Sequence, residues 1–249
     1  MKQSRFFIML SSAAMVLFLT SCGGSGNGEK TNTDTTKAAT DTSTAATTIP
    51  TSTIVTSPQN MMVVTHKVKD FAKWKPSYDA HDSMRLAFGV HSYVIGRGLT
   101  DSNMVLVATK VDDLAKAKAF SKDPSLKKAM EKGGVTGMPS ISFVTMTFQD
   151  TSTLDPKTIR SRATFTVKDW DTWQKAFEEG KQDRMANGIM VRAYGHDADN
   201  NKKVVVVTAL ADTAKAFAYW KSDAFKKRIE SSGVTGQLQR FLYTVVQRY

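Results

Sequence analysis

Apolar and polar positions follow the same order in two consecutive parts of the chain, and each part predicts the same set of elements. Residues 68–89 return as residues 167–188 at a constant offset of 99 residues (167 − 68). In each part the alternating and helical periodicities predict a strand, a helix, two strands, a second helix and a last strand. We therefore interpret the chain from about residue 61 onward as an internal duplication.

The first predicted helix has recognisable residues at its start, on its buried face and at its end. Asp70 stands where a carboxylate can accept a free backbone N–H as the N-cap. Spacings of four, three, four and three place on one helix face the residues Trp74, Tyr78, His81, Arg85 and Phe88. Gly89 then ends the helix in the left-handed conformation that glycine adopts most easily. The second copy has the same features at Asp169, Trp173, Arg184 and Gly188.

The strand pattern predicts a sheet that is covered on both faces. In the first copy the strands are expected at residues 62–68, 90–96 and 104–109, with a last strand ending near Phe148. In the second copy, residues 204–207 are four consecutive valines, so this strand is apolar on both of its faces. Such a strand needs helices on one side and further protein on the other.

The second predicted helix begins near Asp113, or near Asp212 in the second copy. In the first copy Asp123-Pro124 interrupts it, because proline cannot continue a helix from within. A Gly-Val-Thr-Gly turn follows in both copies, at residues 134–137 and 233–236. This turn leads into the last strand.

The predicted order βαββαβ is the ferredoxin-like arrangement, with two helices on one face of a four-stranded antiparallel sheet. Because both sheet faces need cover and the unit occurs twice, we predict an α+β fold in which two ferredoxin-like repeats pack sheet-to-sheet as a single-chain α+β barrel. The element order, the V-x-D-x-x-x-W opening at residues 68–74 and the Gly-Val-x-Gly turn resemble the dimeric α+β barrel superfamily. That superfamily includes antibiotic-biosynthesis monooxygenases, stress-responsive barrel proteins and haem-degrading proteins.

In most members of that superfamily two chains form the barrel, so the resemblance implies that this chain forms it alone, as a monomer. The haem-degrading members use an asparagine, a tryptophan and a histidine. Neither predicted first strand contains an asparagine. We therefore predict no haem, and no other cofactor.

The N-terminal region predicts export. Lys2 and Arg5 precede an apolar run over residues 6–19, and Leu19-Thr20-Ser21-Cys22 resembles the lipobox of bacterial lipoproteins. This resemblance implies a signal peptide over residues 1–21 and a membrane anchor on lipidated Cys22, the only cysteine of the chain. A non-cleaved anchor is the alternative. Gly23 in place of aspartate favours the bacterial outer membrane, with the leaflet left open.

Composition sets the remaining boundaries. Residues 22–59 are rich in glycine, serine and threonine and predict a flexible, disordered tether, because they offer little apolar surface to bury. The first repeat is expected at residues 60–150, a linker at 151–160 and the second repeat at 161–249.

The net charge is +11, or +9 after Lys2 and Arg5 leave with the signal peptide (11 − 2). The lysines are scattered over helix faces, and no arginine-rich or aromatic-interleaved basic motif is present. We therefore predict no nucleic-acid partner. The basic surface fits an environment of anionic lipid or polysaccharide.

No nucleotide-binding, zinc-protease or hydrolase motif is present, and the histidines have no metal-ligand spacing, so we predict no metal. Three of the four histidines lie in the first repeat, where the second has Phe165, Gly180 and Met190. This asymmetry directs attention to a candidate ligand pocket formed by His66, His81, Arg85, His91 and Tyr93. The corresponding region of the second repeat contributes Arg184, Arg192 and Tyr194.

A base, a cation and a phenol in one cleft would suit an acidic or phenolic ligand. The structural alternatives are that His66 is a hydrogen-bonded core residue and that Arg85 and Arg184 pair with carbonyl or carboxylate groups near the helix ends. Trp74 and Trp173 are expected in the core.

Two functions follow. The first is an envelope-anchored lipoprotein that binds a small apolar or acidic ligand or a protein partner. The alternative, implied by the superfamily resemblance, is a cofactor-independent monooxygenase acting on a phenolic or polyketide-like substrate. The monooxygenase requires the five candidate residues to converge on one enclosed pocket, whereas the binding protein does not.

Overall fold

The computed structural model describes residues 52–249. The predicted signal peptide, Cys22 and all but the end of the predicted tether lie outside the described residues. Within the described residues, two halves each contribute one sheet and four short helices.

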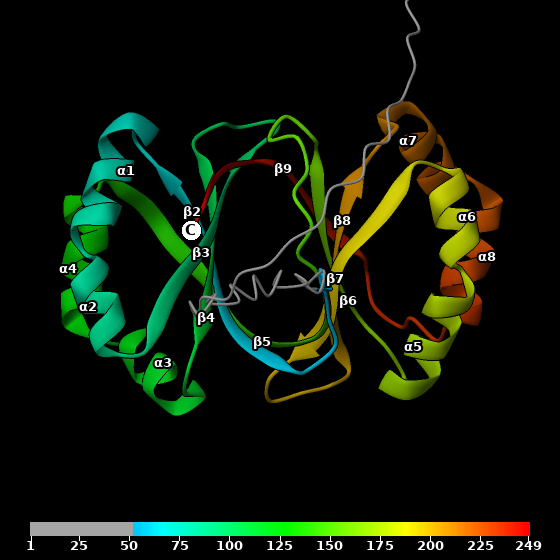
Figure 1. Cartoon of the computed structure of the whole chain (residues 1–249), viewed down its shortest axis with the longest axis horizontal. Coiled ribbons are helices and arrows are strands. Elements are labelled where there is room, and N and C mark those ends of the chain that lie inside the picture. Colours follow the sequence, from blue (N-terminus) through cyan, green and yellow to red (C-terminus); the bar gives the residue numbers. More distant parts are fainter. Residues whose placement is uncertain (1–51) are drawn as a thin grey trace, which may run out of the picture. The chain divides into compact units, whose positions relative to one another are not determined.

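The strands form one closed antiparallel barrel (Figure 1). The first half contributes β2 (Gln59–Val68), β3 (Val90–Gly98), β4 (Met104–Val111) and β5 (Val135–Asp150). The second half contributes β6 (Arg160–Thr166), β7 (Ile189–Asp197), β8 (Lys203–Leu210) and β9 (Gln239–Arg248). Their order is β5-β2-β4-β3-β9-β6-β8-β7, and pairing between β7 and β5 closes the ring. The long last strand of each half therefore joins it to the other half, through β5 with β7 and β9 with β3.

The helices cover the two outer sides of the barrel (Figure 1). On one side lie α1 (Phe71–Ala80), α2 (Asp82–Ala87), α3 (Leu114–Phe120) and α4 (Pro124–Lys132). On the other lie α5 (Trp170–Glu179), α6 (Lys181–Ala186), α7 (Thr213–Lys221) and α8 (Asp223–Ser231). The predicted fold class is confirmed: two βαββαβ halves pack sheet-to-sheet in a single-chain α+β barrel.

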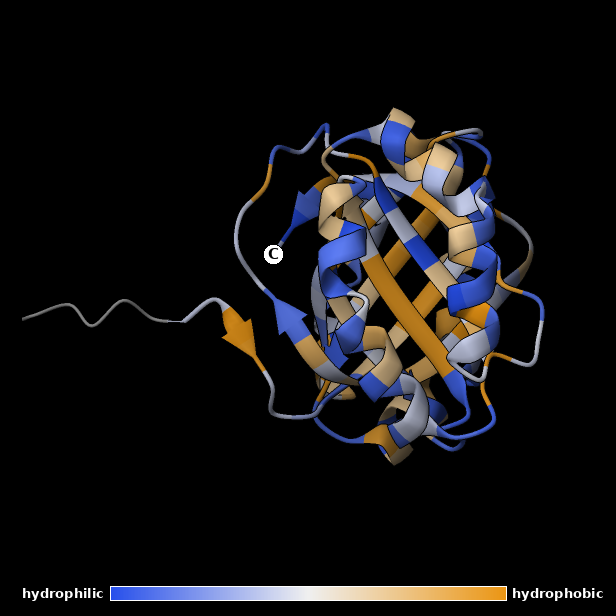
Figure 2. Cartoon of the chain, turned by 90° about the vertical axis from the view of Figure 1, so that its right-hand side faces the viewer, coloured by the Kyte–Doolittle hydropathy of each residue, from blue (hydrophilic) through white to orange (hydrophobic). Residues whose placement is uncertain are grey.

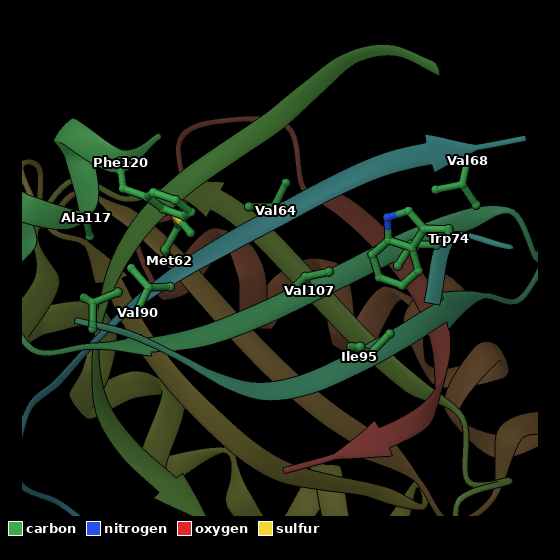
Figure 3. Packing of buried hydrophobic residues seen from close by; sticks show 11 residues of the cluster. Met62, Val64, Val68, Trp74, Val90, Ile95, Val107, Ala117 and Phe120 are labelled. Carbon is green, nitrogen blue, oxygen red and sulfur yellow. The ribbon is translucent and has the colours of Figure 1, made fainter. Parts of the chain in front are cut away.

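Both faces of the sheet are buried, as the valine run predicts. Val204 and Val206 pack beneath the helices of the second half, whereas Val205 faces the barrel interior. Figure 2 shows the apolar strands beneath these helices. In the first half, Met62 and Val64 line the helix-facing side of β2 together with Trp74 of α1 (Figure 3). Each half thus has a helix–sheet core, and the two halves share the barrel interior.

The expected helix starts and stops are present. Asp70 accepts hydrogen bonds from the backbone N–H groups of Ala72 and Lys73, and Asp169 accepts one from Thr172. Past the helix, Gly89 has a φ of +65°, a conformation that a side chain would strain. Trp74 and Trp173, expected in the core, are buried.

The continuous first helix predicted from the sequence is wrong, because the helix breaks at His81 and at Gly180. At each break an arginine donates to a carbonyl one turn earlier, which also accepts the backbone N–H of the residue at the break. Arg85 Nη1 donates to the carbonyl of Tyr78 at 2.6 Å, and Arg184 repeats the contact in the second half. The second helix also breaks in both halves, whereas the sequence predicts a break only in the first. In the second half Ser222 begins α8 by accepting a hydrogen bond from the N–H of Phe225.

The folded unit begins before the predicted boundary at residue 60. A short strand, β1 (Ile54–Val55), pairs with the end of β5. Because β2 begins at Gln59, it also contains Asn60, so the prediction that the first strand lacks an asparagine is wrong. The side-chain oxygen of Asn60 accepts a hydrogen bond from Thr145 Oγ1 at 2.9 Å.

Candidate functional site

A cavity of about 260 Å³ lies inside the barrel. Its apolar lining includes Met61, Val63, Leu106, Ala108, Met146 and Val207. Its charged lining consists of four arginines and one carboxylate: Arg160, Arg162, Arg192, Arg248 and Asp150. The cavity is therefore strongly cationic, although it lies within an apolar barrel.

Two of these arginines have buried nitrogen atoms without a hydrogen-bond partner among the described residues. These atoms are Nη1 of Arg160 and Nε of Arg162. Arg160 is 7% exposed. Burial lowers the pKa of both guanidinium groups, and the nearby Arg192 and Arg248 lower that of Arg160 further. Because guanidinium remains charged in proteins, these are buried cations with unused donors.

Other donors of the cavity arginines have partners within the protein, and Arg162 Nη2 donates to Ser142 Oγ at 3.2 Å. Arg192 Nη1 donates to Asp150 at 2.6 Å and to Ser152 Oγ at 2.8 Å. Arg248 Nη2 donates to the hydroxyl of Tyr93 at 2.7 Å. Arg192 thereby holds the start of the segment that connects the two halves, and Thr153, Leu154 and Pro156 of that segment line the cavity.

Tyr243 lies deep in the same cavity. It is 4% exposed, and burial raises its pKa to about 12, so the hydroxyl stays protonated at physiological pH. Its ring packs directly on Gly96, where an added Cβ would lie 2.3 Å from a ring carbon. With Tyr93 it adds two phenols to the cationic wall.

A second, smaller cavity of about 60 Å³ lies between the helices and sheet of the first half. His66, His81 and Arg85 line it, together with Tyr78. Both ring nitrogens of His66 are buried without a hydrogen-bond partner among residues 52–249. Burial lowers the pKa of His66 to about 4, so the ring is neutral at pH 7. The ring lies 5.4 Å from that of Trp74, centroid to centroid.

The second half has a cavity of about 80 Å³ at the matching place. Phe165 and Phe177 stand there where the first half has His66 and Tyr78. Arg184 lines this cavity, while Tyr194 packs among the aromatic rings of the same half. The two helix–sheet cavities thus differ at these two positions, where a histidine and a tyrosine of the first half correspond to two phenylalanines of the second.

The five candidate residues of the first repeat are divided among three places. His66, His81 and Arg85 surround the first helix–sheet cavity, whereas Tyr93 and Arg192 line the barrel cavity. His91 lies on the surface, where its Nε2 is 2.8 Å from a carboxylate oxygen of Asp112. The five candidate residues do not converge on one enclosed pocket.

Sequence reasoning missed Arg160, Arg162, Arg248 and Tyr243 because it compared only the histidines of the two repeats. The signal was present in β6. Arg160 and Arg162 alternate with Ser161 and Ala163, which places both cations on one face of a strand. A charged face on a strand whose two sides must both be covered indicates a polar interior site.

Among residues 52–249, no group of three histidine, cysteine or acidic side chains is placed to hold a metal ion. Over the same residues, no helix has both the length and the apolar character needed to cross a membrane.

Comparison with known proteins supports the fold. No protein-family profile matches the sequence, and no curated protein matches it either. A candidate monooxygenase from Fusobacterium nucleatum shares 14% identity, with 76% of this chain and 93% of that chain covered and a TM-score of 0.52. An anthrone oxidase-like protein shares 14% identity, with 79% and 95% covered and a TM-score of 0.54. At these identities the likeness shows the fold alone.

Proposed function

We propose that this protein binds a small acidic molecule inside its barrel. The observation that carries the proposal is the pair of buried guanidinium groups, Arg160 and Arg162, with N–H donors aimed at no protein acceptor. A buried charge without a partner destabilises a fold, and a charge-assisted hydrogen bond to a carboxylate or phenolate removes much of that penalty. Asp150 does not fill this role, because Arg192 and the backbone of Ser152 engage it.

The remaining expectations about the cell envelope belong to the same proposal. Cys22 would carry the lipid and hold the barrel at the bacterial outer membrane as a monomer, because one chain supplies both halves of the barrel. Mass spectrometry of the natively purified protein tests whether Cys22 carries the lipid. A diacylated peptide beginning at Cys22 supports it, and an unmodified Cys22 within an uncleaved chain contradicts it.

Ligand-dependent thermal stability tests the binding proposal. Benzoate is the probe, and benzamide is its neutral isostere. At 100 times the dissociation constant, binding stabilises the native state by about 2.7 kcal/mol. For a domain of this size that free energy corresponds to a rise in Tm of roughly 5–10 °C. Benzoate should produce this rise and benzamide should not.

Two variants locate the effect. R162V removes a cavity arginine whose Nε is unpaired, and we expect it to abolish most of the benzoate shift. R240M is the matched control, because Arg240 is a partly buried arginine of the same half that stacks on Trp220 and lines the second helix–sheet cavity instead. If R240M loses the shift and R162V keeps it, the barrel cavity is not the site.

A second candidate function is oxidation of a phenolic or polyketide-like substrate, centred on the first helix–sheet cavity. His66 favours it, because a buried, neutral imidazole with unpaired nitrogens can accept a hydrogen bond from the hydroxyl of a phenolic substrate and orient it. The two solved structures described above are named as a candidate monooxygenase and as anthrone oxidase-like. Oxygen uptake with anthrone as the probe tests it. The uptake should be lost in H66F and retained in R162V, and no uptake by the unaltered protein contradicts it.

A further inference from the structure

All four arginines of the barrel cavity come from the second half. Subtracting the offset of 99 gives their counterparts in the first half. For Arg160, Arg162, Arg192 and Arg248 the counterparts are Met61, Val63, Tyr93 and Gln149. All four counterparts also line the cavity, and none is charged. Strand pairing supports the match. Met61 pairs with Lys110 and Arg160 pairs with Ala209, so the pairing partners of the two residues are also 99 positions apart.

The two sets of residues stand on opposite walls. In the closed ring of eight strands, β2 and β6 are four strands apart in either direction, and so are β3 and β7, and β5 and β9. Met61 and Val63 on β2 therefore face Arg160 and Arg162 on β6 across the barrel. At these two matched positions one wall is apolar and the other is cationic.

A symmetric dimer of the same fold must carry the same residue at both matching positions, because its two walls are identical by symmetry. A single chain that supplies both halves is free of that constraint. The two walls differ at four matched pairs of positions around one cavity. In each pair the first half supplies the uncharged residue and the second half supplies the arginine. Such a cavity distinguishes the two ends of a ligand.

We propose that the barrel cavity binds an amphipathic monoanion in one orientation, and this proposal rests on the proposed function. The acidic group lies between Arg160 and Arg162, within reach of their unpaired nitrogens. The apolar body lies against Met61 and Val63. A volume of about 260 Å³ corresponds to about nine water molecules at about 30 Å³ each. That space fits an aliphatic acid of six to eight carbons or a single aromatic ring with one carboxylate.

Titration calorimetry on the full chain tests the ligand class with acetate, butanoate, hexanoate, hexanol and inorganic phosphate as probes. Burial of each methylene should raise the affinity about fourfold, so hexanoate should bind more than 100-fold more tightly than acetate. Hexanol and phosphate should each bind at least tenfold more weakly than hexanoate. Acetate or phosphate binding as tightly as hexanoate overturns the amphipathic class and leaves acid binding intact. No binding by any acid overturns both proposals.

Orientation is tested by NMR on the unaltered chain with ¹³C-labelled methionine methyl groups. The terminal methyl protons of bound hexanoate should show intermolecular contacts to the methyl groups of Met61 and Met146, which line the apolar wall. Contacts from the CH₂ next to the carboxylate to those methionines, with none from the terminal methyl, overturn the orientation.

The exchanged variant M61R/R160M keeps the composition and moves one cation to the other wall. It should still bind hexanoate, with the contacts of the terminal methyl to Met146 reduced or lost. Unchanged contacts in a folded exchanged variant contradict the proposal. The experiment on the unaltered chain decides the question if this variant does not fold.

Discussion

Replacing His66 by phenylalanine, the residue at the matching position of the second half, should remove a pH dependence of stability. Burial lowers the pKa of His66 from 6.5 to about 4 in the folded protein. Below pH 6.5 the unfolded chain binds a proton at this position and the folded chain does not. Stability from this group is therefore complete above pH 6.5 and is lost as the pH falls toward 4.

The shift of 2.5 pH units (6.5 − 4) corresponds to about 3.4 kcal/mol in total. Of this, about 2 kcal/mol is lost between pH 7.5 and pH 5. The assay is urea unfolding of the protein and of H66F at a series of pH values. Other titrating groups are common to both proteins, so they largely cancel in the difference of unfolding free energy. As the pH falls from 7.5 to 5, the unaltered protein should lose about 2 kcal/mol of unfolding free energy relative to H66F.

V64A is the matched control, because Val64 lies on the same strand and face as His66 and carries no titratable group. Its destabilisation should be the same at every pH. If the difference for H66F is equally flat, burial does not hold the pKa of His66 below its usual value.

Three further predictions concern the fold around the cavities. R85M should destabilise the protein by about 1–3 kcal/mol in urea unfolding, because the carbonyl of Tyr78 loses one of its two donors and Asp82 loses its ion pair; an unchanged midpoint would show that water replaces the guanidinium equally well. G96A should cost about 1–3 kcal/mol because its methyl group meets the ring of Tyr243, and full stability would mean that the ring moves freely. D150N removes the ion pair of Arg192 and should speed proteolysis within residues 151–159; an unaltered cleavage rate contradicts the anchoring role.

The fold could be predicted because its signals are local and occur twice. Asp70 predicts a helix start, Gly89 predicts a helix end, and the valine run at residues 204–207 predicts a strand buried on both faces. The structure confirms all three. The helix break at His81 escaped prediction because no residue there forbids a helix. The break is accompanied by a contact over seven residues that a continuous helix pattern does not predict, in which Arg85 donates to the carbonyl of Tyr78.

The candidate site could be predicted only in part. The comparison of repeats correctly indicated that the halves differ, but the histidine differences fall mainly around the small helix–sheet cavity. The difference between Arg160 and Met61, and between Arg162 and Val63, has meaning only when the strands face each other across a closed barrel. Strand order and closure depend on pairing between β5 and β7, which no local pattern encodes.

A crystal structure of the protein with 4-bromobenzoate tests the central claim most directly, because the anomalous signal of bromine locates the ligand independently of its shape. The account predicts a carboxylate hydrogen-bonded to Arg160 and Arg162 inside the barrel, with the bromine against Met61 and Val63. A barrel without the ligand, and a bromine peak in a helix–sheet cavity or on the surface, would contradict it.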